Sequence, residues 1–407
     1  MKNKKYKLRK NCLCCNNNRL NEIINLGLHS FADRFIPLKL KFKLDPIYPL
    51  ILDMCKNCSF IQSRVITNPK DRYLSFDYSY TSSNSLYAKT HWQEFATSID
   101  KKIGIKNKKI IEIGSNDGYL SSILKNNGAD ILAVDASSFM TKVSKKKKLN
   151  ALNLIFSFKE SKIIKKKFGE ADIIIANNVF NHSNNPNNFL KGVNNLLKKN
   201  GHFIFEQPNF AKGLEAKKFD QIYHEHISYF TSKNINSILN CNNFKINNIS
   251  SNDYHGGSLR TISVKDKSNL ETFDISKFIQ KEEKKNIYKI SYYKKLNKFF
   301  VKEKNNLKKK INRYIKMGYV VCGVGAGAKS NTFLTFNQLD NTKINFITDN
   351  SKYKINKLTP LTRIIIKSDL EINKYKKIVC LLLSWNISNL ISKKIKKINS
   401  KIKIIRI

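Results

Sequence analysis

The sequence has no long apolar run. Its longest apolar stretches, such as IVCLLLSW at 378–385, fall far short of the ~20 residues that a helix needs to cross a bilayer. The chain opens with MKNKKYKLRKN, which is basic and polar, so we expect no secretory signal. These absences predict a soluble cytoplasmic protein with no membrane partner.

Acidic residues are also scarce: 30 Asp and Glu stand against 75 Lys and Arg, giving a formal net charge of +45. Such a surface attracts the phosphates of nucleic acids. However, lysine greatly outnumbers arginine and is spread along nearly the whole chain, and lysine is the weaker residue for bidentate recognition of phosphates and bases. Nucleic-acid binding is therefore not the expected function, although the charge keeps an RNA methyltransferase as an alternative.

The chain of 407 residues is too long for one ordinary core, so we expect two to three domains. We place their boundaries at 1–75, 76–250 and 251–407. In the middle segment short apolar strands alternate with helical stretches, which predicts a parallel sheet covered on both faces. A charged, helical stretch at 271–316 follows, and the same alternation then begins again. The expected fold class is α/β, with two doubly wound domains.

Five of the eight cysteines lie near the N-terminus. Cys12-x-x-Cys15 and Cys55-x-x-Cys58 supply four thiolates in two close pairs, the pattern of a closed, structural zinc site. Cys14 could replace Cys12 as a ligand, but the spacing favours Cys12. Because no ligand position would stay open, such a metal would stabilise the small domain and take no part in chemistry.

The segment IIEIGSNDGYL lacks the phosphate-binding pattern G-x-G-x-x-G. Gly114 and Gly118 allow a tight turn from a strand into a helix and leave room for a ligand. Glu112 and Asp117 would repel a pyrophosphate but suit a cationic ligand. Asp135 ends the next strand, where a carboxylate can accept hydrogen bonds from a ribose. Together these residues point to S-adenosylmethionine, whose sulfonium and amino groups are positive.

The segment FDQIYHEHISYF holds two of the seven histidines. His224, Glu225 and His226 are flanked by Tyr223 and Tyr229. A histidine titrates near neutral pH and suits a general base, and tyrosine hydroxyls can stabilise negative charge on a substrate oxygen. A metal pair made by the two histidines is an alternative, but no third ligand is obvious nearby.

A second glycine-rich turn, VVCGVGAGAKS, follows a strand in the C-terminal segment. Gly325 and Gly327 would let backbone N–H groups surround a phosphate, and Lys329 would add positive charge. We expect the nucleotide diphosphate of a substrate here, because the middle segment already holds the cofactor.

Several motifs, in order, resemble the C-methyltransferases that act on nucleotide-linked keto-deoxysugars. The paired C-x-x-C motifs are similar to that family's N-terminal zinc domain, and EIGSNDGYL and ADIIIANNVFNH to its cofactor-binding core. FDQIYHEHISYF is the family's most characteristic segment, and HGGSLR follows it. GAGAKSNTFLTF and LLLSWN resemble its C-terminal domain. The resemblance covers nearly the whole chain and implies a zinc-binding domain, a Rossmann-like S-adenosylmethionine methyltransferase domain and a second Rossmann-like domain.

The resemblance also implies roles for individual residues. Asp135 stands where the family usually has glutamate, and the sequence around Gly325 matches the family motif less closely. With the turn residues above included, the expected cofactor site consists of Glu112, Gly114, Asn116, Asp117, Gly118, Asp135, Asn177 and Asn178. The expected catalytic group consists of His226, Glu225, Tyr223, His182, Tyr80 and Tyr78. The expected substrate site consists of His255, Gly256, Gly257, Ser258, Arg260, Gly325, Gly327 and Lys329.

The implied reaction is methylation of a sugar carbon next to a ketone, and it requires that the proton on that carbon is first removed. We expect His226 to be the base, Tyr223 to donate to the substrate oxygen, and Glu225 to orient His226 or bind substrate. In an extended strand Glu225 and His226 would face opposite ways, so a direct pairing requires a turn. A binding protein without catalysis is an alternative. We expect a monomer or a weak homo-oligomer with a small-molecule substrate.

Overall fold

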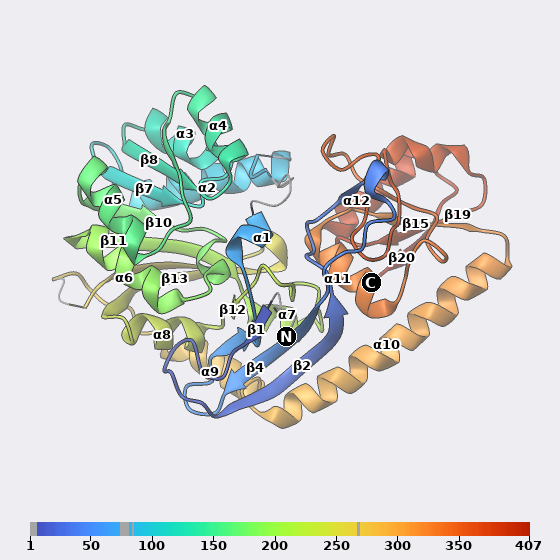
Figure 1. The fold of residues 1–407 in the computed structure, drawn as a ribbon, viewed down its shortest axis with the longest axis horizontal. Helices are drawn as coiled ribbons and strands as arrows, with labels where there is room; N and C mark the ends of the chain where they lie inside the picture. The colour runs from blue at the N-terminus through green and yellow to red at the C-terminus, as the bar shows by residue number, and fades with distance from the viewer. Residues whose placement is uncertain (1–5, 74–80, 84, 267–268) are drawn as a thin grey trace.

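The computed structural model describes residues 6–73, 81–83, 85–266 and 269–407. Two α/β lobes lie side by side, and the N-terminal strands lie between their lower ends (Figure 1). Within the described ranges, no helix is both long and apolar enough to cross a membrane. The N-terminal elements are β1 (Tyr6–Leu8), β2 (Leu20–His29), β3 (Ile36–Pro37), η1 (Leu38–Leu40), β4 (Tyr48–Cys55), β5 (Ile61–Ser63), β6 (Val65–Thr67) and α1 (Pro69–Tyr73).

The first lobe is built on a seven-stranded sheet of order β13-β14-β11-β10-β7-β8-β9. Five strands are parallel, and β14 pairs antiparallel with both β11 and β13. The strands are β7 (Lys109–Ile113), β8 (Asp130–Asp135), β9 (Asn150–Asn153), β10 (Ala171–Ile175), β11 (Leu197–Pro208), β13 (Phe244–Asn252) and β14 (Ser258–Lys265).

Helices cover both faces of this sheet, as the buried residues of β7 show. Ile111 packs in the cluster that contains Phe189 of α6, whereas Ile110 packs in the one that contains Phe95 of α2. Successive strand residues thus face opposite layers, which is why the strand reads as a continuous apolar run. The helices of this lobe are α2 (Leu86–Ile103), α3 (Tyr119–Asn126), α4 (Ser138–Lys146), α5 (Phe158–Phe168), α6 (Pro186–Leu196), α7 (Phe210–Glu215) and α8 (Ser232–Asn240).

The second lobe has five parallel strands in the order β18-β16-β15-β19-β20. The first strand in sequence lies in the middle, and the chain winds outward in both directions, as in doubly wound folds. This confirms the predicted fold class. The elements are β15 (Val320–Val324), α11 (Ala328–Asn337), β16 (Phe346–Thr348), β17 (Lys357–Leu358), β18 (Ile366–Lys367), η4 (Asp369–Lys374), β19 (Ile378–Leu382), η5 (Trp385–Ile387), α12 (Ser388–Ile398) and β20 (Lys403–Arg406).

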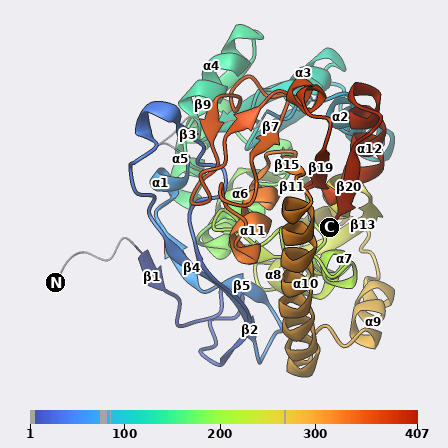
Figure 2. The ribbon, with the colours of Figure 1, turned by 90° about the vertical axis from the view of Figure 1, so that its right-hand side faces the viewer.

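The predicted domain boundary at 250 lies within an element of the first lobe. It falls inside β13, and β14 still belongs to the seven-stranded sheet, so the first lobe runs to Lys265. The charged helical stretch then forms α9 (Ser276–Lys284) and the long α10 (Ile290–Lys316), which connects the two lobes (Figures 1 and 2).

Two short pairings tie the N-terminal domain to both lobes. β12 (Ser228–Tyr229), the end of the FDQIYHEHISYF segment, pairs antiparallel with β5 and completes a four-stranded sheet of order β12-β5-β4-β2. β3 pairs antiparallel with β17 of the second lobe. The first of these pairings binds the histidine segment to the N-terminal domain.

Candidate active site

Four cysteine side chains meet in the N-terminal domain. The Sγ atoms of Cys12 and Cys58 are 3.6 Å apart, and those of Cys15 and Cys55 are 3.7 Å apart. All four lie within 4.8 Å of one another. Sulfurs bound at about 2.3 Å to a tetrahedral zinc ion are roughly 3.8 Å apart. The donor set and its spacing therefore fit that ion.

Cys14 lies beside this cluster and is not one of its four members. Its Sγ is 3.8 Å from the Sγ of Cys241, and its backbone N–H donates to the Sγ of Cys12 at 3.4 Å. An N–H donor to a sulfur stabilises the thiolate form. The grouping agrees with the Cys12-x-x-Cys15 spacing.

The predicted glycine turn follows β7. Gly114 and Gly118 have φ of +75° and +71°, a region that residues with a Cβ adopt only under strain. A Cβ on Gly118 would lie 2.6 Å from the side chain of Leu149. The turn lies where the order of the sheet reverses, with β8 on one side of β7 and β10 on the other. Doubly wound sheets bind their ligands at this point.

Three carboxyl groups gather at the turn. Glu112 is buried and accepts a hydrogen bond from the hydroxyl of Ser121. Asp135, at the end of β8, accepts from the backbone N–H of Asn116 at 2.8 Å. Burial, reinforced by the charge of Asp117, raises the pKa of Glu112 to about 8 and also raises the pKa of Asp135. A cationic ligand would offset this repulsion.

Asp117 itself is engaged by a segment from before α2. The hydroxyls of Ser82 and Ser83 each donate to its carboxylate, and the backbone N–H of Ser82 donates to the side chain of Asn116 at 2.9 Å. Lys147 lies 3.8 Å from the same carboxylate. The two serines were not predicted as site residues, although they directly follow the expected tyrosine segment. Tyr78 and Tyr80 lie outside the described residues.

The loop after β10 carries the two predicted asparagines. Asn177 accepts from the backbone N–H of Glu206 at 2.8 Å, and the N–H of Asn178 donates to the carbonyl of the same residue at 2.8 Å. Within the described part of the chain, the buried Nδ2 of Asn177 has no acceptor. The side chain therefore offers a donor at the carboxyl edge of the sheet, beside the glycine turn.

The histidine segment is a series of turns that ends in β12. The backbone N–H of His226 donates to the carbonyl of Tyr223 at 2.9 Å, which closes one turn. The N–H of Ile227 then donates to the carbonyl of Asn181 at 2.8 Å, so the segment is bound to the loop after β10. The chain therefore turns at this segment, and His226 lies next to His182, with ring centroids 5.1 Å apart.

His226 is buried and held in one orientation. Its Nδ1 lies 2.8 Å from the carbonyl of Gln221, which makes Nδ1 the protonated nitrogen and leaves Nε2 as the acceptor. The ring packs on that of Tyr223 at 4.0 Å between centroids. Burial, with a contribution from the charge of Lys329, lowers the pKa of His226 to about 3. The imidazole is therefore neutral at physiological pH and able to accept a proton.

Glu225 does not orient His226, because the carbonyl of Gln221 does so. Only 1% of Glu225 is exposed, and neither carboxylate oxygen has a hydrogen-bond partner among the described residues. Burial first, and then the negative charge of Asp33, raise the pKa of Glu225 to about 8. A buried polar group without a partner is costly, so of the two predicted roles this geometry favours that of a substrate ligand.

His224 has a structural environment. Its Nε2 lies 3.1 Å from the carbonyl of Pro49, and its ring meets those of Phe31 and Tyr48 edge-on. Burial lowers the pKa of His224 to about 4. Since His224 and His226 bond to different carbonyls, the geometry does not support the alternative of a His-x-His metal pair.

The HGGSLR motif meets the second lobe. The carbonyl of His255 accepts from Nζ of Lys329 at 2.7 Å. Gly256, in η3 (Tyr254–Gly256), packs so closely against Trp385 that a Cβ would lie 2.5 Å from its ring. The structure thus brings together His255 and Lys329, which are 74 residues apart in the sequence, and places both near His226.

The rest of this motif has structural partners. Ser258 donates to the carbonyl of Tyr254 at 3.0 Å. Arg260 donates to the buried carboxylate of Glu206 at 2.9 Å, and Gly257 packs against a lysine side chain. These contacts hold the turn into β14, and they do not favour the predicted role of these residues as substrate ligands.

The predicted phosphate cradle of the second lobe is not formed. A phosphate would have to displace the carboxylate of Asp349, which would also repel it. The Nζ of Lys329 donates to the carbonyl of His255. The N–H groups of Gly325, Ala326 and Gly327 already donate, in that order, to the carbonyl of Thr348, the carboxylate of Asp349 and the hydroxyl of Ser330.

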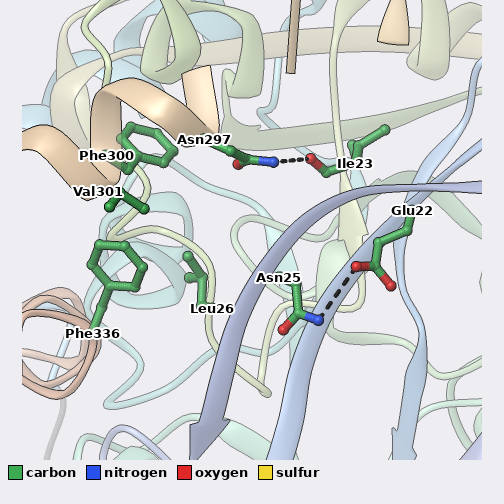
Figure 3. Close-up of a pocket in the computed structure, with 8 residues that line it drawn as sticks. All are labelled: Glu22, Ile23, Asn25, Leu26, Asn297, Phe300, Val301 and Phe336. Atoms are coloured by element: carbon green, nitrogen blue, oxygen red, sulfur yellow. Dashed lines mark hydrogen bonds between the residues drawn. The ribbon is translucent and has the colours of Figure 1, made fainter. Parts of the chain in front are cut away.

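A cavity of about 210 Å³ lies elsewhere, between β2, α10 and α11 (Figure 3). None of its residues was predicted as a site residue, and we assign it no part in the reaction. It is lined by Glu22, Ile23, Asn25, Leu26, Asn297, Phe300, Val301 and Phe336. A smaller cavity lies against His226 and is lined by Asn181, Pro208, Phe210, Gln221, His226, Ser228, Tyr229 and Phe230.

Two family models match the chain. One, a methyltransferase domain, matches residues 87–249, and the other, a C-methyltransferase C-terminal domain, matches residues 253–405. Over 377 residues the chain is 22% identical to the C-methyltransferase NovU of Streptomyces niveus, covering 92% of this chain and 89% of NovU.

Three further similar proteins match only part of the chain. A ubiquinone biosynthesis O-methyltransferase of Pelagibacter ubique is 34% identical over 126 residues, 30% of this chain and 50% of that protein. The PH0226 protein of Pyrococcus horikoshii has a TM-score of 0.38 at 16% identity, covering 49% of this chain and 100% of that one. A magnesium protoporphyrin IX methyltransferase of Synechocystis has a TM-score of 0.36 at 16% identity, covering 44% and 83%.

Proposed function

Because this chain is an S-adenosylmethionine-dependent C-methyltransferase, we propose that it methylates a ring carbon next to a ketone in a nucleotide-linked deoxysugar, carbon 3 of a 4-keto sugar. The observation that carries the proposal is His226, a buried neutral imidazole whose Nδ1 is bound to a carbonyl. Its motif resembles that of enzymes acting on such sugars.

The carboxyl edge of the first sheet holds the cofactor in this proposal. Bound S-adenosylmethionine supplies an electrophilic methyl group. The cationic groups of the cofactor favour the ionised form of Glu112, whose pKa burial raises to about 8, so Glu112 and Asp135 present negative charge to them. Asp135 also keeps lone pairs for ribose hydroxyls. Asn177 offers the Nδ2 donor that has no acceptor in the described part of the chain.

His226 removes the proton from the carbon that is to be methylated. Its Nε2 accepts the proton, while Nδ1–H stays on the carbonyl of Gln221, so the ring cannot turn away. The electron pair left behind delocalises into the neighbouring ketone as an enolate, and Tyr223 and His182 lie beside His226 to donate hydrogen bonds to its oxygen. A base of low pKa is weak, so stabilisation of the enolate must supply much of the driving force.

The cysteine cluster binds zinc in this proposal, and the ion is structural. Four sulfur ligands close the coordination sphere, so the metal takes no part in methyl transfer. It joins the segment between β1 and β2 to the β4–β5 hairpin, whose strand β5 pairs with β12, and it thereby stabilises the edge on which the catalytic segment docks.

The decisive experiment compares His226→Asn with a control, His202→Asn, at a half-buried histidine of β11. Both are incubated with labelled S-adenosylmethionine and a panel of nucleotide-linked 4-keto deoxysugars. We expect His226→Asn to lower turnover by at least about 100-fold, as loss of a general base does, and the control to retain it. In D₂O with S-adenosylhomocysteine, only the control should exchange the substrate's acidic hydrogen. Full exchange by His226→Asn would refute the assignment.

A further inference from the structure

Asp220 lies at the boundary between the two lobes, six residues before the proposed base. It is 3% exposed. Its Oδ2 accepts a hydrogen bond from the indole Nε1–H of Trp385 at 2.8 Å, across 165 residues of sequence. Its Oδ1 has no hydrogen-bond partner among the described residues. A buried carboxylate held by one indole donor is a costly feature, which calls for a function.

Trp385 is fixed on more than one side. The ring lies against Gly256, where a Cβ would come within 2.5 Å, and the ammonium of Lys218 lies 5.7 Å from the ring centroid. The indole N–H is thus aimed at Asp220 by packing, and glycine at position 256 provides the space. Burial raises the pKa of Asp220, and the charge of Lys329, which donates to the neighbouring carbonyl of His255, acts against this shift.

The next residue connects this contact to the chemistry. Gln221 follows Asp220 directly, and its carbonyl is the group that accepts from Nδ1 of His226 at 2.8 Å. A shift or rotation of the peptide at 220–221 would remove this acceptor. The imidazole would then be free to exchange its protonated nitrogen, and a base must present the unprotonated nitrogen to the substrate.

We propose that Asp220 is a positioning residue, and that its hydrogen bond to Trp385 of the second lobe holds the Gln221 carbonyl that fixes the tautomer of His226. This inference rests on the proposed function, in which His226 is the base. The second lobe therefore contributes to catalysis without supplying a group that touches the reacting carbon.

The test uses three variants of the full-length protein. Trp385→Phe keeps an aromatic ring on Gly256 and removes the N–H. Asp220→Ala removes the acceptor, whereas Asp220→Asn keeps an acceptor for the indole and removes the charge. Loss of one such hydrogen bond should lower kcat about tenfold, with KM changed by less than about threefold. Asp220→Asn should restore most of kcat.

A direct readout does not depend on turnover. Nitrogen-15 spectra of protein labelled at its seven histidines, with the signals of His226 identified by their loss in His226→Asn, report which ring nitrogen carries the proton. We expect protonated Nδ1 in the parent protein and a mixture in Trp385→Phe and Asp220→Ala. The two ideas can fail separately. If His226 is not the base, the His226→Asn assay shows it, whereas the tautomer of His226 in the other variants is unaffected.

Trp92 supplies a matched control, since it is the only other tryptophan of the chain and its buried indole N–H has no acceptor among the described residues. Trp92→Phe should keep both kcat and the tautomer. If Trp385→Phe does not fold, the comparison of Asp220→Ala with Asp220→Asn tests the proposal. Equal kcat for Asp220→Ala and Asp220→Asn, or an unchanged tautomer in Asp220→Ala, would overturn the proposal.

Discussion

Replacing Glu225 by glutamine should stabilise the protein at neutral pH, although it removes a proposed functional group. Burial raises the pKa of this carboxyl to about 8 from its ordinary value of 4.5. Between these values the unfolded chain releases a proton that the folded protein keeps. Stability of the parent protein therefore falls as the pH rises through this window.

The size of the effect follows from the width of the window. The interval from pH 4.5 to pH 7 spans about 2.5 pH units, and each unit corresponds to about 1.4 kcal/mol. The ionisation of Glu225 in the unfolded chain therefore lowers the free energy of unfolding at pH 7 by roughly 3 kcal/mol. Glutamine fills nearly the same volume and has no proton to lose. Glu225→Gln should thus unfold at higher temperature or denaturant concentration than the parent at pH 7, and the gain should disappear near pH 4.5.

Glu206 is the matched control because it is equally buried and well paired. Burial alone would raise its pKa, but the hydrogen bonds and charges of His91 and Arg260 outweigh burial and lower it. Glu206→Gln should therefore destabilise the protein by about 3 kcal/mol at pH 7. If the free energies of unfolding of Glu225→Gln and the parent change equally with pH between 4.5 and 8, the reasoning is refuted.

Two further predictions concern the metal and the cofactor. Metal analysis should find one zinc ion per chain. Cys58→Ser should lose most of the zinc and unfold at a lower temperature, whereas Cys322→Ser in the second lobe should retain it. Equal zinc content in both variants would contradict the assignment. Asp135→Ala should weaken S-adenosylmethionine binding by at least about tenfold in calorimetry, because it removes an acceptor of charge-assisted hydrogen bonds, and an unchanged Kd would show that Asp135 does not hold the ribose.

Periodic patterns and local spacing were sufficient for much of the molecule. Short apolar runs alternating with helical stretches predicted the parallel strands of both sheets, because buried parallel strands need apolar residues on both faces. The paired cysteines predicted the cluster, since each C-x-x-C is local and only two such units had to meet. The positions of the glycine turn and of Asp135 could also be predicted, because they lie at the ends of strands that the pattern had already located.

Contacts between distant segments could not be read in this way. Any residue can supply a carbonyl, so nothing in the sequence marks Gln221 as the partner of His226. The pairing of Asp220 with Trp385 depends on how two lobes pack, and the motif around Gly325 gives no sign that Asp349 fills its turn. Sequence determined the kinds of groups present and the sheets that carry them, and tertiary structure alone decided which groups meet, because that depends on packing between chain segments that share no local pattern.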